Sequence, residues 1–236
     1  MTCDWNGNII KVKLTETVKS GGYISIMKPS IRTPFFEIGT KNYIYGDTLL
    51  EYAKAADAAA AKYDIDVLFI TSPIEIRRVA ENTKNLIILA PYMDTLYPGR
   101  GMADILPEGL KAAGAKGVVV NHSEKPMSLP AIKDTIDRAN ELDFLVFACA
   151  DTIAEAKAIA HLNPDIINPE PSELIGGTDV SDMSYVLESI KVIKAINPEI
   201  LVEQAAGITN GQQVYDFIMA GSDAAGSASG IMNAED

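Results

Sequence analysis

Cysteine is scarce in this chain of 236 residues, which contains only Cys3 and Cys149. The two lie far apart, and neither belongs to a Cys-x-x-Cys pair. A disulfide framework and a cysteine-rich metal site are therefore not expected, and a reducing compartment is the default.

Long apolar runs and an excess of basic residues are also missing. No run reaches the ~18 residues of a membrane span, and residues 1–19 lack the apolar stretch of a signal peptide. Lys and Arg number 20 against 32 Asp and Glu, a net charge of −12, which argues against nucleic acid and anionic membranes as partners. We expect a cytoplasmic protein that acts on a small molecule. A small anionic substrate is still compatible with this net charge, because a few N–H donors and one Lys next to the substrate outweigh distant surface charge.

The apolar content, 47% of residues, is enough for a sizeable core. From residue 35, eight short apolar runs alternate with stretches of 3–4 residue apolar spacing, typical of parallel strands covered by amphipathic helices. The expected strands are 35–40, 66–71, 86–90, 117–121, 143–148, 165–170, 199–204 and 223–229. This order predicts an α/β fold, a closed parallel (β/α)8 barrel. An open doubly wound sheet is the alternative, disfavoured because no Gly-x-Gly-x-x-Gly stands at the first strand-to-helix turn.

Both ends fit this barrel poorly. Residues 1–30 form no obvious barrel element, so we divide the chain into an N-terminal extension, 1–30, and a barrel catalytic domain, 31–236. After the last expected strand there is no room for a full eighth helix. We therefore expect a barrel that lacks this helix, with the gap covered by the extension, covered by a neighbouring subunit, or left open.

Three polar residues follow predicted strands, at the barrel end where active sites gather. They are Lys41 after strand 1, His122 after strand 4 and Glu170 after strand 6. Each alone has an ordinary explanation, such as a solvated surface charge or a helix cap. Together they form a set in which a carboxylate removes a proton next to a carbonyl, an imidazole polarises that carbonyl and an ammonium steadies the negative charge.

Three sequence runs resemble the triosephosphate isomerase family, especially its shorter archaeal type. VVVNHSEKPMSL (118–129) resembles the strand-4 motif, LNPDIINPEPSELIGG (162–177) the strand-6 and lid segment, and residues 205–231 the phosphate-binding loops 7 and 8. The resemblance implies an isomerase of glycolysis and gluconeogenesis that interconverts dihydroxyacetone phosphate and glyceraldehyde 3-phosphate through an enediol, without a metal or an organic cofactor.

The same resemblance assigns roles to individual residues. It implies that Glu170 is the base, His122 the electrophile, Lys41 the stabilising cation and Glu124 a supporting carboxylate, and that the segment 171–180 closes as a lid. The residues implied to contact substrate or phosphate are Gly39, Gly176, Gly177, Ala206, Gly207, Ser229 and Gly230.

The chain departs from the family pattern at positions that would contact substrate. The usual Asn-x-Lys of strand 1 reads Gly39-Thr40-Lys41, the lid has Gly176-Gly177-Thr178 in place of Gly-Thr-Gly, and Ala205 replaces a common Gly. Two alternatives to the triose substrate therefore stay open. One is isomerisation of another small sugar phosphate, such as a tetrulose phosphate, and the other is a non-catalytic barrel that binds a phosphorylated metabolite.

Family members associate through the loop after strand 3, so the resemblance implies a homo-oligomer, a dimer or a tetramer. In this chain that loop is 91–107, and Tyr92, Met93, Leu96 and Tyr97 are its candidate apolar contacts. Local packing of these side chains under a long loop is the alternative.

Overall fold

A computed structural model of the chain describes residues 2–3, 9–10, 28–175 and 181–234. Eight parallel strands form a closed barrel in the order β10-β3-β4-β5-β6-β7-β8-β9. Their bounds are β3 (Phe35–Gly39), β4 (Val67–Ile70), β5 (Leu86–Ala90), β6 (Gly117–Val120), β7 (Leu145–Ala150), β8 (Ile166–Pro169), β9 (Leu201–Gln204) and β10 (Ala224–Ser227). The predicted barrel is confirmed.

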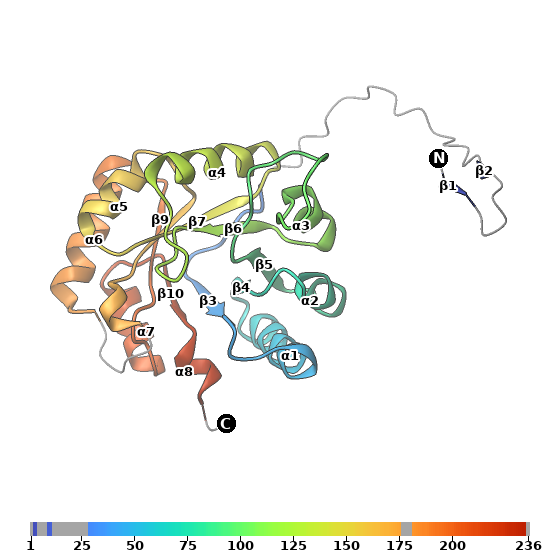
Figure 1. The fold of residues 1–236 in the computed structure, drawn as a ribbon. Coiled ribbons are helices and arrows are strands. Elements are labelled where there is room, and N and C mark those ends of the chain that lie inside the picture. Colours follow the sequence, from blue (N-terminus) through green and yellow to red (C-terminus); the bar gives the residue numbers. More distant parts are fainter. Residues whose placement is uncertain (1, 4–8, 11–27, 176–180, 235–236) are drawn as a thin grey trace.

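Helices follow the strands and surround the barrel (Figure 1). They are α1 (Gly46–Tyr63), α2 (Ile76–Asn82), α3 (Pro107–Ala113), α4 (Leu129–Glu141), α5 (Ile153–Ala160), α6 (Met183–Ile196), α7 (Gly211–Met219) and α8 (Ser229–Met232), with a 3₁₀ turn η1 (Ser172–Leu174) after β8. The eighth position, expected to be empty, holds the single turn α8, which is shorter than a full barrel helix.

Side-chain direction alternates along each strand and divides the core into two parts. One set of residues, including Leu68, Leu89, Val119 and Phe147, fills the barrel interior. Their strand neighbours pack outward against the helices in a larger cluster. The interior is therefore a packed apolar layer, and it supports whatever lies above it at the carboxyl ends of the strands.

Short polar signals fix where several helices begin. The Asn210 side chain accepts hydrogen bonds from the N–H groups of Gln212 and Gln213 and starts α7 with a capping box. Thr152 caps α5 and Ser128 caps α4 in the same manner, each accepting one backbone N–H. These caps set the length of the loops that connect strand ends to helices.

The chain enters the barrel at the amino ends of the strands. Lys28 forms an ion pair of 2.7 Å with Asp165, and the Arg32 guanidinium contacts Asp64 and Asp66. Before this point, Thr2–Cys3 (β1) pairs antiparallel with Ile9–Ile10 (β2). Residue 28 thus already contacts the barrel, and the domain boundary at residue 30 stays a prediction.

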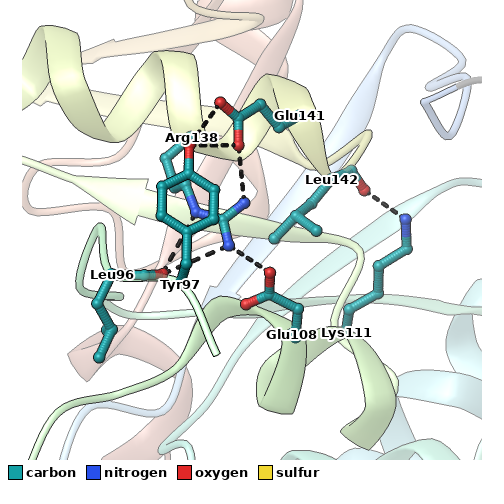
Figure 2. Close-up of polar contacts among 7 residues, drawn as sticks. All are labelled: Leu96, Tyr97, Glu108, Lys111, Arg138, Glu141 and Leu142. Carbon is teal, nitrogen blue, oxygen red and sulfur yellow. Dashed lines mark hydrogen bonds and ion pairs between the residues drawn. The ribbon is translucent and has the colours of Figure 1, made fainter. Parts of the chain in front are cut away.

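A buried arginine fastens the long loop between β5 and α3 to helix α4 (Figure 2). The Arg138 side chain is 4% exposed, and its guanidinium forms ion pairs with Glu108 and Glu141. It also donates to the Leu96 carbonyl and lies 4.1 Å from the centre of the Tyr97 ring. Arg138, together with the hydrogen bonds from the Tyr97 hydroxyl to Glu141, therefore holds the loop against α4.

Candidate active site

The carboxyl ends of the strands surround a pocket of about 290 Å³. The predicted residues that line it are Gly39, Lys41, His122, Glu124, Glu170, Gly207 and Ser229. Two further predicted residues, Ala206 in the loop after β9 and Gly230 in helix α8, are chain neighbours of lining residues. Gly176 and Gly177 fall outside the described residues. The structure therefore brings together the three residues that the sequence singled out for chemistry.

His122 follows β6 and points one ring nitrogen into the pocket. Its Nδ1 accepts a hydrogen bond of 3.1 Å from the backbone N–H of Glu124, so the proton of the neutral ring is on Nε2. Nε2 lies 4.0 Å from Oε2 of Glu170. Burial, and then the positive charge of Lys41, lower the pKa of His122. The imidazole is thus a neutral donor, which suits polarisation of a carbonyl.

Glu170 follows β8 in a stiff setting between Pro169 and Pro171. Its backbone N–H donates to the carbonyl of Ala150 at 2.8 Å, which continues the pairing of β8 with β7. The carboxyl side chain is 12% exposed. Burial raises the pKa of Glu170 to about 7, against the lowering effect of Lys41. A carboxylate with this pKa is a stronger base than an exposed one.

Lys41 reaches the same pocket from the end of β3. Its backbone is left-handed, with φ of 45°, and its Nζ donates to Oε1 of Glu124 at 2.7 Å. The hydrogen bond from Lys41 lowers the pKa of Glu124, so that carboxyl is ionised at neutral pH. Lys41 and Glu124 thus form an ion pair at the pocket rim.

Asn121 positions His122, and the sequence analysis did not single it out. Its amide donates to the carbonyl of Cys149 and to Oε1 of Glu155, at 3.0 and 2.9 Å. Its Oδ1 accepts the backbone N–H of Met127. Its own backbone has φ of 59°, which Asn tolerates better than most residues. The loop that carries His122 is therefore fixed by one amide.

The loop after β9 touches the end of β10 and helix α8 at the pocket wall. The Ser227 hydroxyl donates to the carbonyl of Ile208 at 2.8 Å. A side chain on Gly230 would lie 2.7 Å from the Ser227 Oγ and closer still to the Ile208 carbonyl. Gly207 adopts φ of 70°, a conformation that glycine adopts without strain. These contacts place Gly207 and Ser229 on one side of the pocket.

Glu37, Asn168 and Glu203 form a polar layer below the pocket that the sequence analysis did not detect. They point inward from β3, β8 and β9, each less than 9% exposed. Part of the signal was present, because Glu37 is a single charge in the apolar run of β3 and Glu203 is the single charge of β9. Glu37 lines the pocket itself.

The described residues, 2–3, 9–10, 28–175 and 181–234, contain no group of three or more His, Cys, Asp or Glu side chains arranged to hold a metal ion. Within the same ranges, none of the helices has the length and apolarity needed to cross a membrane.

The parallel barrel and the Lys, His and Glu side chains at its rim define an α/β-barrel enzyme built for proton transfer next to a carbonyl. A family model described as triosephosphate isomerase matches residues 37–216. The chain belongs to the triosephosphate isomerase family.

Individual relatives agree over most of their length. A triosephosphate isomerase of Methanobacterium bryantii is 35% identical over 209 residues, 86% of this chain and 92% of the relative. That of Methanothermus fervidus is 32% identical over 194 residues, covering 81% and 87%, and that of Methanocaldococcus jannaschii 34% over 199 residues, covering 83% and 90%. The likeness to the archaeal type, inferred from three short motifs, is confirmed.

Proposed function

We propose that this chain is a triosephosphate isomerase that interconverts dihydroxyacetone phosphate and D-glyceraldehyde 3-phosphate. The observation that carries the proposal is the 4.0 Å approach of His122 Nε2 and Glu170 Oε2 in one pocket, with Lys41 at the same rim. This is the arrangement that proton transfer between two neighbouring carbons needs. The relatives named above carry the same enzyme name.

Each of the three residues has one role in the proposed reaction. Glu170 takes the proton from the carbon next to the carbonyl and returns it to the neighbouring carbon. His122, through Nε2–H, donates to the carbonyl oxygen and moves protons between the two oxygens. Lys41 exchanges its contact with Glu124 for the negative charge of the enediolate. The reaction then needs neither a metal nor an organic cofactor.

The phosphate end of the substrate is assigned to the loops after β9 and β10. Gly207 and Ser229 line the pocket there, and the neighbouring Ala206 and Gly230 shape the two loops. Backbone N–H groups of small residues let a phosphate approach closely. The lid assigned to 171–180 begins with Pro171 and η1, and its residues 176–180 lie outside the described residues.

A coupled assay tests the reaction and the substrate together. Purified protein is given glyceraldehyde 3-phosphate, and in parallel a four-carbon aldose phosphate, beside Glu170→Gln and the exposed control Glu188→Gln. We expect triose turnover that falls by about 10²–10⁴-fold in Glu170→Gln, because the amide cannot accept the proton, and that stays unchanged in the control. Turnover of the four-carbon substrate alone would transfer the proposal to that substrate. Absence of both activities in folded protein would contradict it.

We further propose a homo-oligomer that acts in the cytoplasm. On the loop 91–107 the Tyr97 side chain is 60% exposed and Met102 is fully exposed, whereas Met93 is buried in the chain's own core. Met93 therefore packs locally, and Tyr97 and Met102 are the apolar side chains that this loop offers to a second copy. Light scattering coupled to size exclusion tests this, and a monomer at the chain's 25.3 kDa would contradict it.

A further inference from the structure

A pair of carboxyl groups lies at the base of the pocket. Glu37 on β3 and Glu203 on β9 flank strand β10, and both point at Gly226. A Cβ atom placed on Gly226 would lie within 2.5 Å of Oε2 of Glu37 and of Oε1 of Glu203. Because Gly226 has no side chain, the two carboxyl groups occupy the space beside its backbone.

Two buried carboxyl groups this close do not ionise together. Glu203 is 0% exposed, and neither of its oxygens has a hydrogen-bond partner among the described residues. A buried carboxyl without a hydrogen-bond partner, next to a second carboxyl, is favoured as the neutral acid. Burial and the nearby Glu37 raise the pKa of Glu203 well above its ordinary value.

Glu37 also reaches toward the substrate. A Cβ atom at Gly39 would lie 3.0 Å from Oε1 of Glu37, and both residues line the pocket. The family motif usually has Asn at the position of Gly39. In this chain the Glu37 carboxyl lies next to the space that the Asn side chain would fill. Asn168, 3% exposed and with Oδ1 unpaired within the described residues, lies in the same interior layer on β8.

We propose that Glu37, as a neutral acid positioned by Glu203, is a further substrate-contacting residue that donates a hydrogen bond to a carbonyl or hydroxyl oxygen of the sugar phosphate. This inference rests on the proposed isomerase function and deepens it. Glu37 takes over a donor role that Gly39 has no side chain to perform, and Glu203 is a positioning residue. The site then selects substrates with an oxygen acceptor at that point.

The charged and titratable groups that face Glu37 set its response to pH. They are Glu170, Lys41, Glu203 and Cys149. Burial and then the charge of Glu170 raise the pKa of Glu37 to about 8, against the opposing effect of Lys41. Glu37 is therefore neutral and a donor below about pH 8. Above it, Glu37 becomes a second anion beside the base and repels the developing enediolate.

The pH profile of kcat/KM tests the proposal in Glu37→Gln, which keeps a donor but cannot ionise. We expect the wild-type profile to fall above about pH 8 and the variant to lack this fall. The exposed control Glu188→Gln should keep it. A wild-type profile without an alkaline fall, or the same fall in Glu37→Gln, would overturn the inference. Absence of any isomerase turnover would instead overturn the proposed function and, with it, this inference.

A reciprocal exchange separates substrate contact from a purely structural role. Gly39→Asn alone should lower kcat/KM because its Cβ meets the Glu37 carboxyl, and Glu37→Ala alone should raise KM. The double variant should recover at least about tenfold, or about 1.4 kcal/mol, over the worse single variant, because the amide takes the place of the acid. No recovery in a double variant with a native circular dichroism spectrum and melting transition would contradict a shared donor role.

Glu203→Gln and Glu203→Leu test the positioning role. The amide can still donate to Glu37, whereas the Leu side chain cannot. We expect the alkaline fall to stay near its wild-type pH in Glu203→Gln and to shift in Glu203→Leu, with a larger change in KM than in kcat. Equal profiles in both variants would contradict a role through Glu37.

Discussion

At the scale of single residues, the chemistry depends on the protonation state of His122. Burial and then the positive charge of Lys41 lower the pKa of His122, and the backbone N–H of Glu124 at Nδ1 also opposes the imidazolium form. A neutral imidazole can donate its Nε2 proton to a carbonyl oxygen of the substrate. An imidazolium would first lose its extra proton to the Glu170 carboxylate. Glu170 can therefore remain the acceptor for the substrate's carbon-bound proton.

The pKa of Glu170 sets the acid side of the activity profile. A base with a pKa of about 7 is protonated below that pH, so we expect kcat/KM to fall about tenfold for each further pH unit. Stopped-flow or coupled rates between pH 5 and 8 measure this, corrected for ionisation of the substrate phosphate near pH 6. Activity that stays flat down to pH 5 would show that Glu170 is not the base or keeps an ordinary pKa.

Some residues of the site could be predicted from the sequence, and others became visible only in the structure. Lys41, His122 and Glu170 come directly after apolar runs, so their place at the rim follows once the strands are known. Glu37 and Glu203 lie inside strands, and their meeting depends on the register of β9, β10 and β3. Register comes from barrel closure, which local patterns do not encode. Each acid could be noticed in the sequence as a charge within a strand, but their pairing could not be predicted from it.

At the scale of elements, the loop between β5 and α3 depends on Arg138 (Figure 2). Arg138→Met keeps most of the volume but leaves Glu108 without its cation in a partly buried site. We expect a loss of about 3–5 kcal/mol in the free energy of unfolding, measured by urea titration. The control Glu141→Gln, whose carboxyl is 48% exposed, should cost at most about 1 kcal/mol. Equal effects of the two changes would contradict the buried anchor.

Close packing between the loops after β9 and β10 gives a second prediction at this scale. Gly230→Ala places a methyl group against the Ile208 carbonyl, so helix α8 and the loop after β9 must separate. We expect kcat/KM for the phosphorylated substrate to fall by roughly 10–100-fold through misplacement of the phosphate site. Gly211→Ala is the matched control, since a Cβ atom there has open space. An unaffected Gly230→Ala enzyme would remove these loops from the site.

Most elements were predictable because each carries its own signal. The eight expected strands lie within about two residues of those observed, since continuous apolar runs between capped helices are typical of a barrel. The turn η1 and the one-turn α8 were not anticipated. Both are too short for a helical period to be visible, and contacts such as Ser172 N–H to Asp151 form only after folding.

At the scale of the whole molecule, the buried carboxyls link stability to pH. A carboxyl whose pKa is raised on folding, from 4.5 to about 8 for Glu37, contributes stability that is full below pH 4.5 and is lost as pH rises through 8. The difference in Tm between Glu37→Gln and wild type should therefore move in favour of the variant between pH 5 and 8. Melting curves at intervals of one pH unit measure it. A constant difference would contradict a raised pKa.

The proton transfer itself is tested most directly by isomerisation in D₂O, followed by proton NMR. Glyceraldehyde 3-phosphate is incubated with wild-type protein or with Glu170→Gln, and the dihydroxyacetone phosphate formed is examined for deuterium. The account predicts deuterium on the carbon next to the carbonyl in at least part of the product, and almost no product with the variant. Product without deuterium, or equal rates from both proteins, would contradict an enediol reaction in which Glu170 is the base.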